Sequence, residues 1–176
     1  MDDLHPLLRT RSSPARFDAG HEITEPEVAL LVEAARWAPS AGNAQPWSFV
    51  VAPRATAVHD RLVRRLAPSA ARWAPDASVL VVNVAHAFWE DSELAYSEFA
   101  DYDLGQAVAH MTVQAQAMGL ASRQFRAFDL DALSKDLAIP AGWQVRTMTA
   151  IGRPLDVGLH PRDRREHGDL ILPTDR

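Results

Sequence analysis

Residues 34–49 of this chain read Ala34-Ala35-Arg36-Trp37-Ala38-Pro39-Ser40-Ala41-Gly42-Asn43-Ala44-Gln45-Pro46-Trp47-Ser48-Phe49. This stretch joins the end of a helix, a polar loop and the start of a strand. The helix begins at Thr24, because Thr24 and Glu27 have the spacing of a capping box. It ends before Pro39, since the residue that precedes a proline disfavours the helical region. Residues 47–52 then predict a strand.

Three polar side chains occupy the loop of this stretch, namely Ser40, Asn43 and Gln45. Two rigid elements would hold their hydroxyl and amide groups in place, and groups held in this way can recognise the edge of a polar heterocycle. The alternative is that Ser40 and Asn43 only cap the helix and form turns, as these residue types commonly do. The residues themselves support both interpretations equally.

The rest of the chain predicts a mixture of helices and strands. The clearest helix ends at Gly119, and its apolar face carries Leu104, Val108, Met111, Ala115 and Met118. Further helices are expected at residues 4–10, 56–66 and 130–137, and further strands at residues 79–85 and 143–151. In the last strand one face is expected to carry Val145, Thr147, Thr149 and Ile151. Because helices and strands follow no regular alternation, the expected class is α+β, with a central, mostly antiparallel sheet flanked by helices.

Length and composition restrict the kind of protein. The 176 residues predict a single domain, residues 1–176, and 47% of them are hydrophobic. There are no cysteines, which excludes disulfides and cysteine-based metal sites, and no histidine spacing indicates a metal site. The net charge of −5 argues against a nucleic-acid partner. No apolar run reaches membrane-spanning length and no signal peptide is evident, so a cytoplasmic location is expected.

Several enzyme motifs are absent from the sequence. The chain contains no G-x-G-x-x-G dinucleotide fingerprint, no Walker A loop, no H-E-x-x-H and no G-x-S-x-G. A second segment does carry chemistry: residues 11–18 read Arg11-Ser12-Ser13-Pro14-Ala15-Arg16-Phe17-Asp18. Arginine and serine close together on a bend form a good phosphate clamp, because arginine offers a fork of charged donors. Taken alone, the segment is better explained as a solvated loop with a turn at Ser13-Pro14.

The two segments together resemble the nitroreductase family of flavoproteins. Residues 34–49 match the family pattern A-R-W-A-P-S-A-x-N-x-Q-P-W-x-F at every specified position. The resemblance extends weakly through residues 103–120, residues 139–140 and residues 150–154, and to the basic stretch at residues 162–165. It implies a homodimer of intertwined chains with two FMN sites across the interface.

The resemblance implies a role for individual residues. Arg11 and Ser13, with Ser12 between them, match the residues that hold the phosphate and ribityl end of FMN. The loop that reaches FMN from the other subunit is matched by Pro39, Ser40 and Asn43, with Gln45 in the same motif. Backbone N–H groups near flavin N5 would come from Arg126, Ala127 and Phe128. Arg164 or Arg165 matches a basic position near the phosphate.

This sequence departs from the family pattern at several places. Ala15 stands where the family often has a basic residue close to the flavin pyrimidine, and Arg16 is one place later. Residues 67–73 lack an asparagine that is common in the family, and Arg72 is a possible replacement cation. Little room is left between residues 85 and 103 for the helical insertion that covers the pocket in longer members, so an open pocket is expected.

The resemblance also implies a reaction. Hydride from NADH or NADPH would reach the flavin, and a nitroaromatic, quinone or enone would then take the electrons from the same face, which gives ping-pong kinetics. Two alternatives remain. The flavin can instead oxidise a peptide or heterocycle and return electrons to oxygen, or the chain can bind flavin without turnover.

Overall fold

The computed structural model describes residues 4–89, 92–155 and 163–174. Its centre is one antiparallel sheet of four strands in the order β1-β2-β4-β3. The strands are β1 (Trp47–Pro53), β2 (Val79–His86), β3 (Ala121–Phe125) and β4 (Trp143–Gly152). β2 and β4 are the inner strands, which explains the continuous apolar run of β2, because both of its faces are covered.

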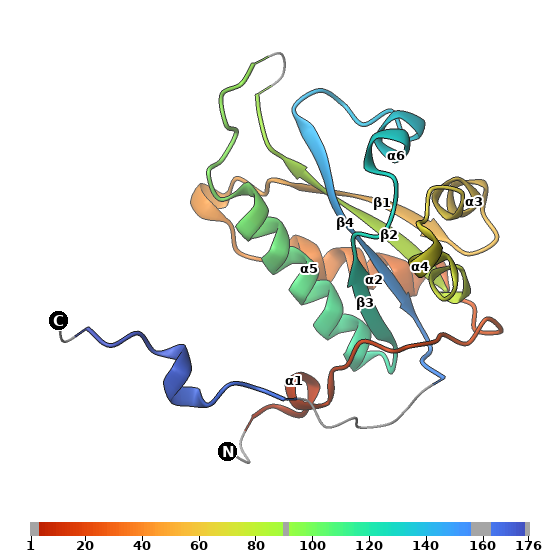
Figure 1. Cartoon of the computed structure of the whole chain (residues 1–176), viewed down its shortest axis with the longest axis horizontal. Coiled ribbons are helices and arrows are strands. Elements are labelled where there is room, and N and C mark those ends of the chain that lie inside the picture. The colour runs from red at the N-terminus through yellow and green to blue at the C-terminus, as the bar shows by residue number, and fades with distance from the viewer. Residues whose placement is uncertain (1–3, 90–91, 156–162, 175–176) are drawn as a thin grey trace.

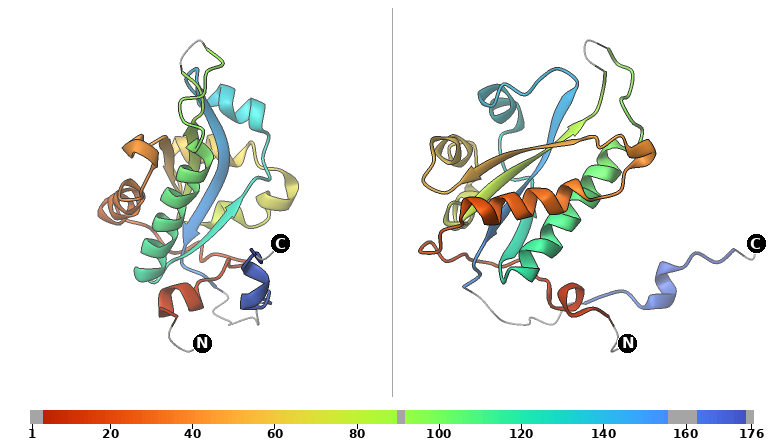
Figure 2. Two further views of the ribbon diagram at one scale, coloured as in Figure 1. Left: turned by 90° about the vertical axis from the view of Figure 1, so that its left-hand side faces the viewer. Right: turned by 180° about the vertical axis from the view of Figure 1, so that it is seen from behind.

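Helices cover both faces of this sheet (Figures 1 and 2). One face carries α2 (Glu25–Arg36) and α5 (Ala100–Ala117), and the other carries α3 (Ala57–Val63), α4 (Pro68–Ala71) and α6 (Leu130–Asp136). The short α1 (Pro6–Thr10) lies near the C-terminal end of α5, and three single turns complete the chain, η1 (Ala41–Asn43), η2 (Ala74–Asp76) and η3 (His167–Leu170). The α+β prediction is confirmed. In the described part of the chain no helix combines the length and the apolar character needed to cross a membrane.

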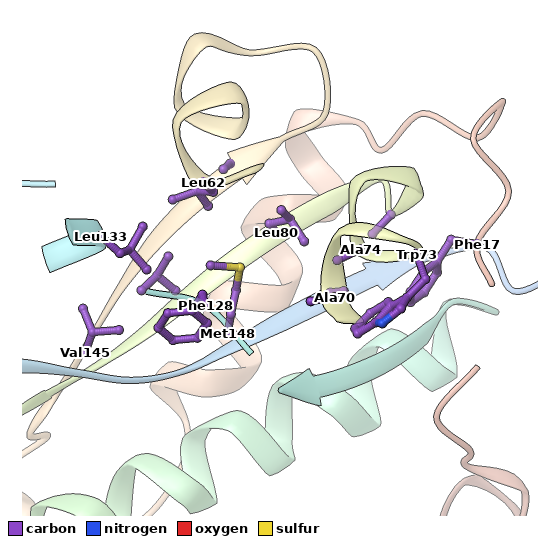
Figure 3. Packing of buried hydrophobic residues seen from close by; sticks show 14 of the residues in the cluster. Phe17, Leu62, Ala70, Trp73, Ala74, Leu80, Phe128, Leu133, Val145 and Met148 are labelled. Carbon is purple, nitrogen blue, oxygen red and sulfur yellow. The ribbon is translucent and has the colours of Figure 1, made fainter. Parts of the chain in front are cut away.

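Three apolar clusters of described residues lie between the sheet and its helices, and the smallest joins Ala85 of β2 to Leu104 and Val108 of α5. Leu80 and Met148 belong to the cluster under α3, α4 and α6, together with Trp73 and Phe17 at its end (Figure 3). Val81 and Ile151 point the other way and pack against α2 and α5. The alternation of side chains along β2 and β4 therefore supplies both cores, as a strand covered on two faces requires.

The local signals in the sequence predict the helix boundaries well. Thr24 and Glu27 form the complete capping box at the start of α2. The side chain of Asp129 accepts a hydrogen bond from the Ala132 amide at the start of α6, a helix that was expected at residues 130–137. Gly119 ends α5 with a φ of 75° in the left-handed region, which glycine adopts without strain.

Two expectations about the sheet need correction. Val145 does not share a face with Thr147 and Ile151, because β4 contains a bulge where Asn83 pairs with Thr147 and Val84 pairs with Val145. Arg146 is the extra residue, and the alternation is reversed beyond it. In addition, β3 is an edge strand that the sequence analysis did not predict, since its residues Ala-Ser-Arg-Gln-Phe do not alternate between apolar and polar.

Candidate cofactor site

A cavity of about 660 Å³ lies along one side of α5. Three parts of the chain build it: the N-terminal segment, α5 itself and the strands β3 and β4. Its lining consists of Leu8, Arg11, Ser13, Asp101, Leu104, Gly105, Val108, Ala109, Thr112, Val113, Gln124, Arg146 and Thr147. The volume is within the range of small-molecule sites, about 300–1,000 Å³.

The lining of the cavity includes apolar side chains and three polar ones, Thr112, Gln124 and Thr147, which we call the polar floor. Leu104 and Val108 of α5 give the apolar side. On the floor, the Gln124 amide donates to the Thr112 hydroxyl over 2.7 Å. Thr147 accepts a hydrogen bond of 2.9 Å from Asn83, which is fully buried. A flat ligand with polar edges would find both a packing surface and hydrogen-bonding groups here.

Arg146 and Asp101 form an ion pair at the end of the cavity that is nearest the start of α5. Arg146 Nε donates to Asp101 Oδ1 over 2.6 Å, and both residues line the cavity. The bulge in β4 is what turns Arg146 and its neighbour Thr147 to the same cavity, although adjacent residues of a regular strand point to opposite faces.

The N-terminal segment reaches the cavity at the opposite end. Arg11 and Ser13 line it, whereas Ser12 and Ala15 do not. The segment is fixed to the end of β4 through Phe17, which is 1% exposed and forms a bridge with Pro154. Arg11 and Ser13 are therefore presented from a part of the chain that is anchored to the sheet.

The loop after α2 has an unusual backbone. Asn43 and Gln45 have φ values of 57° and 47°, in the left-handed region that side chains other than glycine adopt at a cost. Hydrogen bonds compensate: Gln45 N donates to Ser40 Oγ over 3.0 Å, and Ala41 N donates to the buried Asp103 over 3.0 Å. The loop is thus a preformed structure.

The end of α2 that leads into this loop is also well tied. Arg36 and the Trp37 indole both donate to the Glu33 carboxylate, over distances of 2.6 to 2.7 Å. These hydrogen bonds, that of Arg36 first, lower the pKa of Glu33 to about 2. The carboxylate therefore keeps its charge and its two partners throughout the neutral pH range.

The loop and the cavity lie on different sides of α5 within one chain. Asp103 binds the loop, and Gln106 approaches the Pro39 carbonyl at 3.5 Å. Neither of these α5 residues lines the cavity, and Pro39, Ser40, Asn43 and Gln45 do not line it either. Asn43 is exposed at the surface.

The remaining residues expected at the site lie elsewhere. Arg126, Ala127 and Phe128 follow β3 outside the cavity lining, and the Phe128 amide donates to the Arg126 carbonyl over 3.0 Å. Arg164 and Arg165 are exposed in the C-terminal tail, away from the cavity lining. Arg162, in the same basic stretch, falls outside the described residues.

An aromatic cluster also contacts the loop. The His86 ring lies between Tyr96, at a centroid distance of 3.8 Å, and Trp143, at 4.4 Å. The Tyr96 hydroxyl donates to the Ala44 carbonyl over 3.2 Å. His86 and Tyr96 lie in residues 86–99, where no helical insertion was expected, and Trp143 is the first residue of β4. The described residues of the segment 86–99 form no helix before Ala100.

Sequence reasoning missed most of the cavity floor. Thr112, Gln124 and Thr147 come from three different elements, and no spacing in the sequence relates them. Arg146 and Asp101 were also missed, for the same reason. One signal was available for the two threonines. Thr112 lies four residues after Val108 in the predicted helix, and Thr147 lies on the predicted strand face of Val145, so both are polar residues at positions expected to face an apolar core.

Comparisons with known proteins support the resemblance noted above. The profile of the Nitroreductase family matches residues 8–84. A solved oxidoreductase containing FMN is 27% identical, with a TM-score of 0.87, over 97% of this chain and 91% of that chain. A candidate nitroreductase of Desulfovibrio desulfuricans, solved in complex with FMN, is 26% identical, with a TM-score of 0.78, over 97% of each chain. A protein of Archaeoglobus fulgidus described as a candidate NADH dehydrogenase/NAD(P)H nitroreductase is 27% identical, over 89% of this chain and 88% of that protein.

Proposed function

We propose that this chain, which is similar to the nitroreductase family over residues 8–84, is an FMN-dependent oxidoreductase supplied with hydride by NADH or NADPH. We propose nitroaromatics, quinones and enones as its electron acceptors. The observation that carries the proposal is that Arg11 and Ser13 line the α5 cavity, in a chain that is similar to two proteins solved with FMN.

The residues of the cavity fit an FMN molecule. A phosphate needs a cationic donor and neutral donors, which Arg11 and Ser13 offer at one end. An isoalloxazine ring needs an apolar surface and hydrogen-bonding groups at its edges. Leu104 and Val108 supply the surface, while Gln124 and Thr147 supply polar groups. A dinucleotide would need a second phosphate-binding signature, which the sequence lacks.

The protein residues bind and orient, and the cofactor supplies the electron chemistry. Arg11 and Ser13 would hold the phosphate end of FMN, and the bound flavin would supply the chemistry of hydride and electron transfer. Because the reductant and the acceptor would share one face of the site, we expect ping-pong kinetics. No side-chain nucleophile is required, in agreement with the absence of a catalytic triad motif. The Arg146–Asp101 pair lies at the cavity end away from the phosphate clamp, where it would meet a substrate.

We propose further that two chains form the working unit. The Pro39–Gln45 loop of one chain would complete the cavity of the other, because it lies across α5 from its own cavity. The C-terminal tail extends away from the body of the chain (Figure 1) and exposes Leu170, Ile171 and Leu172 by 60%, 62% and 84%. Such apolar side chains need a partner surface, and a second copy would provide it.

Rapid mixing tests the proposal. Purified protein loaded with FMN should lose its yellow absorbance when mixed anaerobically with NADH or NADPH, and a quinone should restore the colour. Arg11→Ala should weaken FMN binding by about one to two decades, since a charged hydrogen bond contributes about 1.5–3 kcal/mol. Lys135→Ala removes an exposed charge on α6 and is the matched control.

The outcomes are distinct. Protein that takes up no FMN would contradict the whole proposal. Protein that binds FMN but is bleached by neither nicotinamide would contradict the reductase reaction and leave the oxidase and the non-catalytic flavoprotein. Equal affinities of the Arg11→Ala and Lys135→Ala variants would show that Arg11 does not hold the phosphate.

A further inference from the structure

Arg123 links the edge strand β3 to the N-terminal segment. Its Nη1 donates to the Pro14 carbonyl over 3.3 Å, and its guanidinium carbon lies 4.0 Å from the ring centroid of Trp73. Arg123 is partly buried, whereas the neighbouring Ala15 and Arg16 are exposed. A guanidinium can stack on a ring and donate from its edge at the same time, because it is planar.

Trp73 provides a rigid platform for this guanidinium. It is 9% exposed and belongs to the larger apolar cluster, where Figure 3 shows it beside Phe17. The edge of Phe125 meets the Trp73 ring at a centroid distance of 4.9 Å, and Phe17 lies at 6.3 Å. Since the platform is part of the core, the position of Arg123 is set by the fold and not by the solvent.

The hydrogen bond from Arg123 to the Pro14 carbonyl acts on the backbone next to Ser13. Upstream, Gln116 of α5 holds Thr10 through a hydrogen bond of 3.4 Å. Downstream, Asp18 N donates to the Arg153 carbonyl over 2.9 Å. Pro14 lies between these two ties, and its ring restricts both its own φ and the conformation of Ser13. Holding the Pro14 carbonyl therefore orients Ser13 and, beyond it, Arg11.

We propose that Arg123 is a positioning residue that determines specificity: it gives the site its preference for a phosphorylated flavin by holding Arg11 and Ser13 in their binding geometry. This inference rests on the proposed function. Donors that are already oriented lose less conformational freedom when the phosphate binds, so their contribution to affinity is larger. Riboflavin, which has the same ring but no phosphate, gains nothing from this orientation.

Titration of apo-protein with FMN and with riboflavin, followed by flavin fluorescence, tests the inference. Arg123→Gln should reduce the ratio of FMN to riboflavin affinity by about tenfold, while riboflavin affinity changes by less than about twofold. Arg123→Lys keeps the charge but not the planar fork, so it should lose most of the preference as well. Lys135→Gln, which removes an exposed charge on α6, should keep the wild-type ratio.

A second variant separates positioning from loss of folding. Trp73→Phe keeps an aromatic ring and the charge of Arg123 but shortens the platform, so it should lower the same affinity ratio in the same direction. Thermal unfolding of each apo-protein confirms that it is folded before titration. If Arg123→Lys retains the full ratio, or if FMN and riboflavin lose affinity equally, the inference is wrong. If wild-type protein binds no FMN, the proposed function is wrong.

Discussion

Arg146 shows how one extra residue in a strand changes which side chains point to each face of the sheet. In a regular β4 it would lie on the opposite face from Thr147, but the bulge opposite Asn83 and Val84 directs both to the cavity. The same bulge places Val145 in the core under α3 and α6. A single extra residue therefore gives the cavity a cation and the other core an apolar side chain.

Gly152 is a second residue whose side chain, or lack of one, shapes the site. A Cβ added there would lie 2.9 Å from the backbone nitrogen of Ser78 and 3.1 Å from Phe17 Cδ1. Glycine thus lets the N-terminal segment, of which Phe17 is the anchor, lie close against the end of β4.

We predict that Gly152→Ala destabilises the protein by about 1–3 kcal/mol, because the backbone of Ser78 cannot move aside as a side chain could. Urea unfolding measures the change. Gly168→Ala is the matched control, since a Cβ there meets nothing within 4 Å. Equal stability of the two variants would mean that the Phe17 region adapts without cost.

At the scale of elements, the Pro39–Gln45 loop depends on contacts from outside itself. Two of its residues other than glycine are left-handed, and Asp103, Gln106 and Tyr96 contact its backbone. Its polar groups are therefore held in place without a ligand, and in the proposed dimer this would lower the entropic cost of binding FMN.

Tyr96→Phe should weaken FMN binding by about threefold to tenfold, because one neutral hydrogen bond to the loop is lost, a contribution of about 0.5–1.5 kcal/mol. The chain offers a close control in Tyr102→Phe, since Tyr102 is 69% exposed on α5. Titration of apo-protein with FMN compares the two. The prediction is wrong if the variants bind FMN equally well.

Helix α3 carries a buried histidine that makes folding sensitive to acid. His59 is 4% exposed, and its Nε2 has no hydrogen-bond partner. Burial lowers the pKa of His59, and the charge of Arg54 lowers it further, against an opposing effect of Asp60. The unfolded chain therefore binds a proton at higher pH than the folded chain does.

The protein should therefore lose stability as the pH falls below about 6.5, which is the pKa of histidine in the unfolded chain. His59 should contribute a loss of at most about 1.4 kcal/mol per pH unit. His59→Leu should remove that part of the loss, whereas His110→Gln, at an exposed position on α5, should keep it. Urea unfolding at pH 7.5 and pH 5.5 measures both. An unchanged pH dependence in His59→Leu would exclude His59 as its source.

At the scale of the whole molecule, the proposed dimer makes a specific demand on two residues. Arg11 lines the cavity, while Asn43 is exposed on the loop that lies across α5. In a symmetric pair of chains these two residues would then serve different sites.

Heterodimers of an Arg11→Ala chain and an Asn43→Ala chain should contain one intact site and one site that lacks both groups. Isolated heterodimers should therefore bind about half of the FMN that wild-type dimers bind. Chromatographic isolation with two different affinity tags, followed by flavin absorbance, gives the ratio. Two equally impaired sites would indicate instead that each chain builds its own site.

Local patterns were sufficient for much of this protein. Capping at Thr24 and Asp129, the stop at Gly119 and the apolar run of β2 act over a few residues, so the sequence predicted these elements and the α+β class. Arg11 and Ser13 line the cavity. Their role in holding a phosphate, which the family resemblance implied and their own segment did not, stays a prediction.

Contacts between distant parts of the chain decided the rest. β3 is a strand because β4 pairs with it, although its own residues do not alternate. The cavity floor joins Thr112 to Gln124, and Arg123 meets Pro14 across 109 positions of sequence. Such pairings depend on the register of the sheet, and one bulge reverses the facing of every residue beyond it. No local pattern records that shift, because it arises when two strands pair.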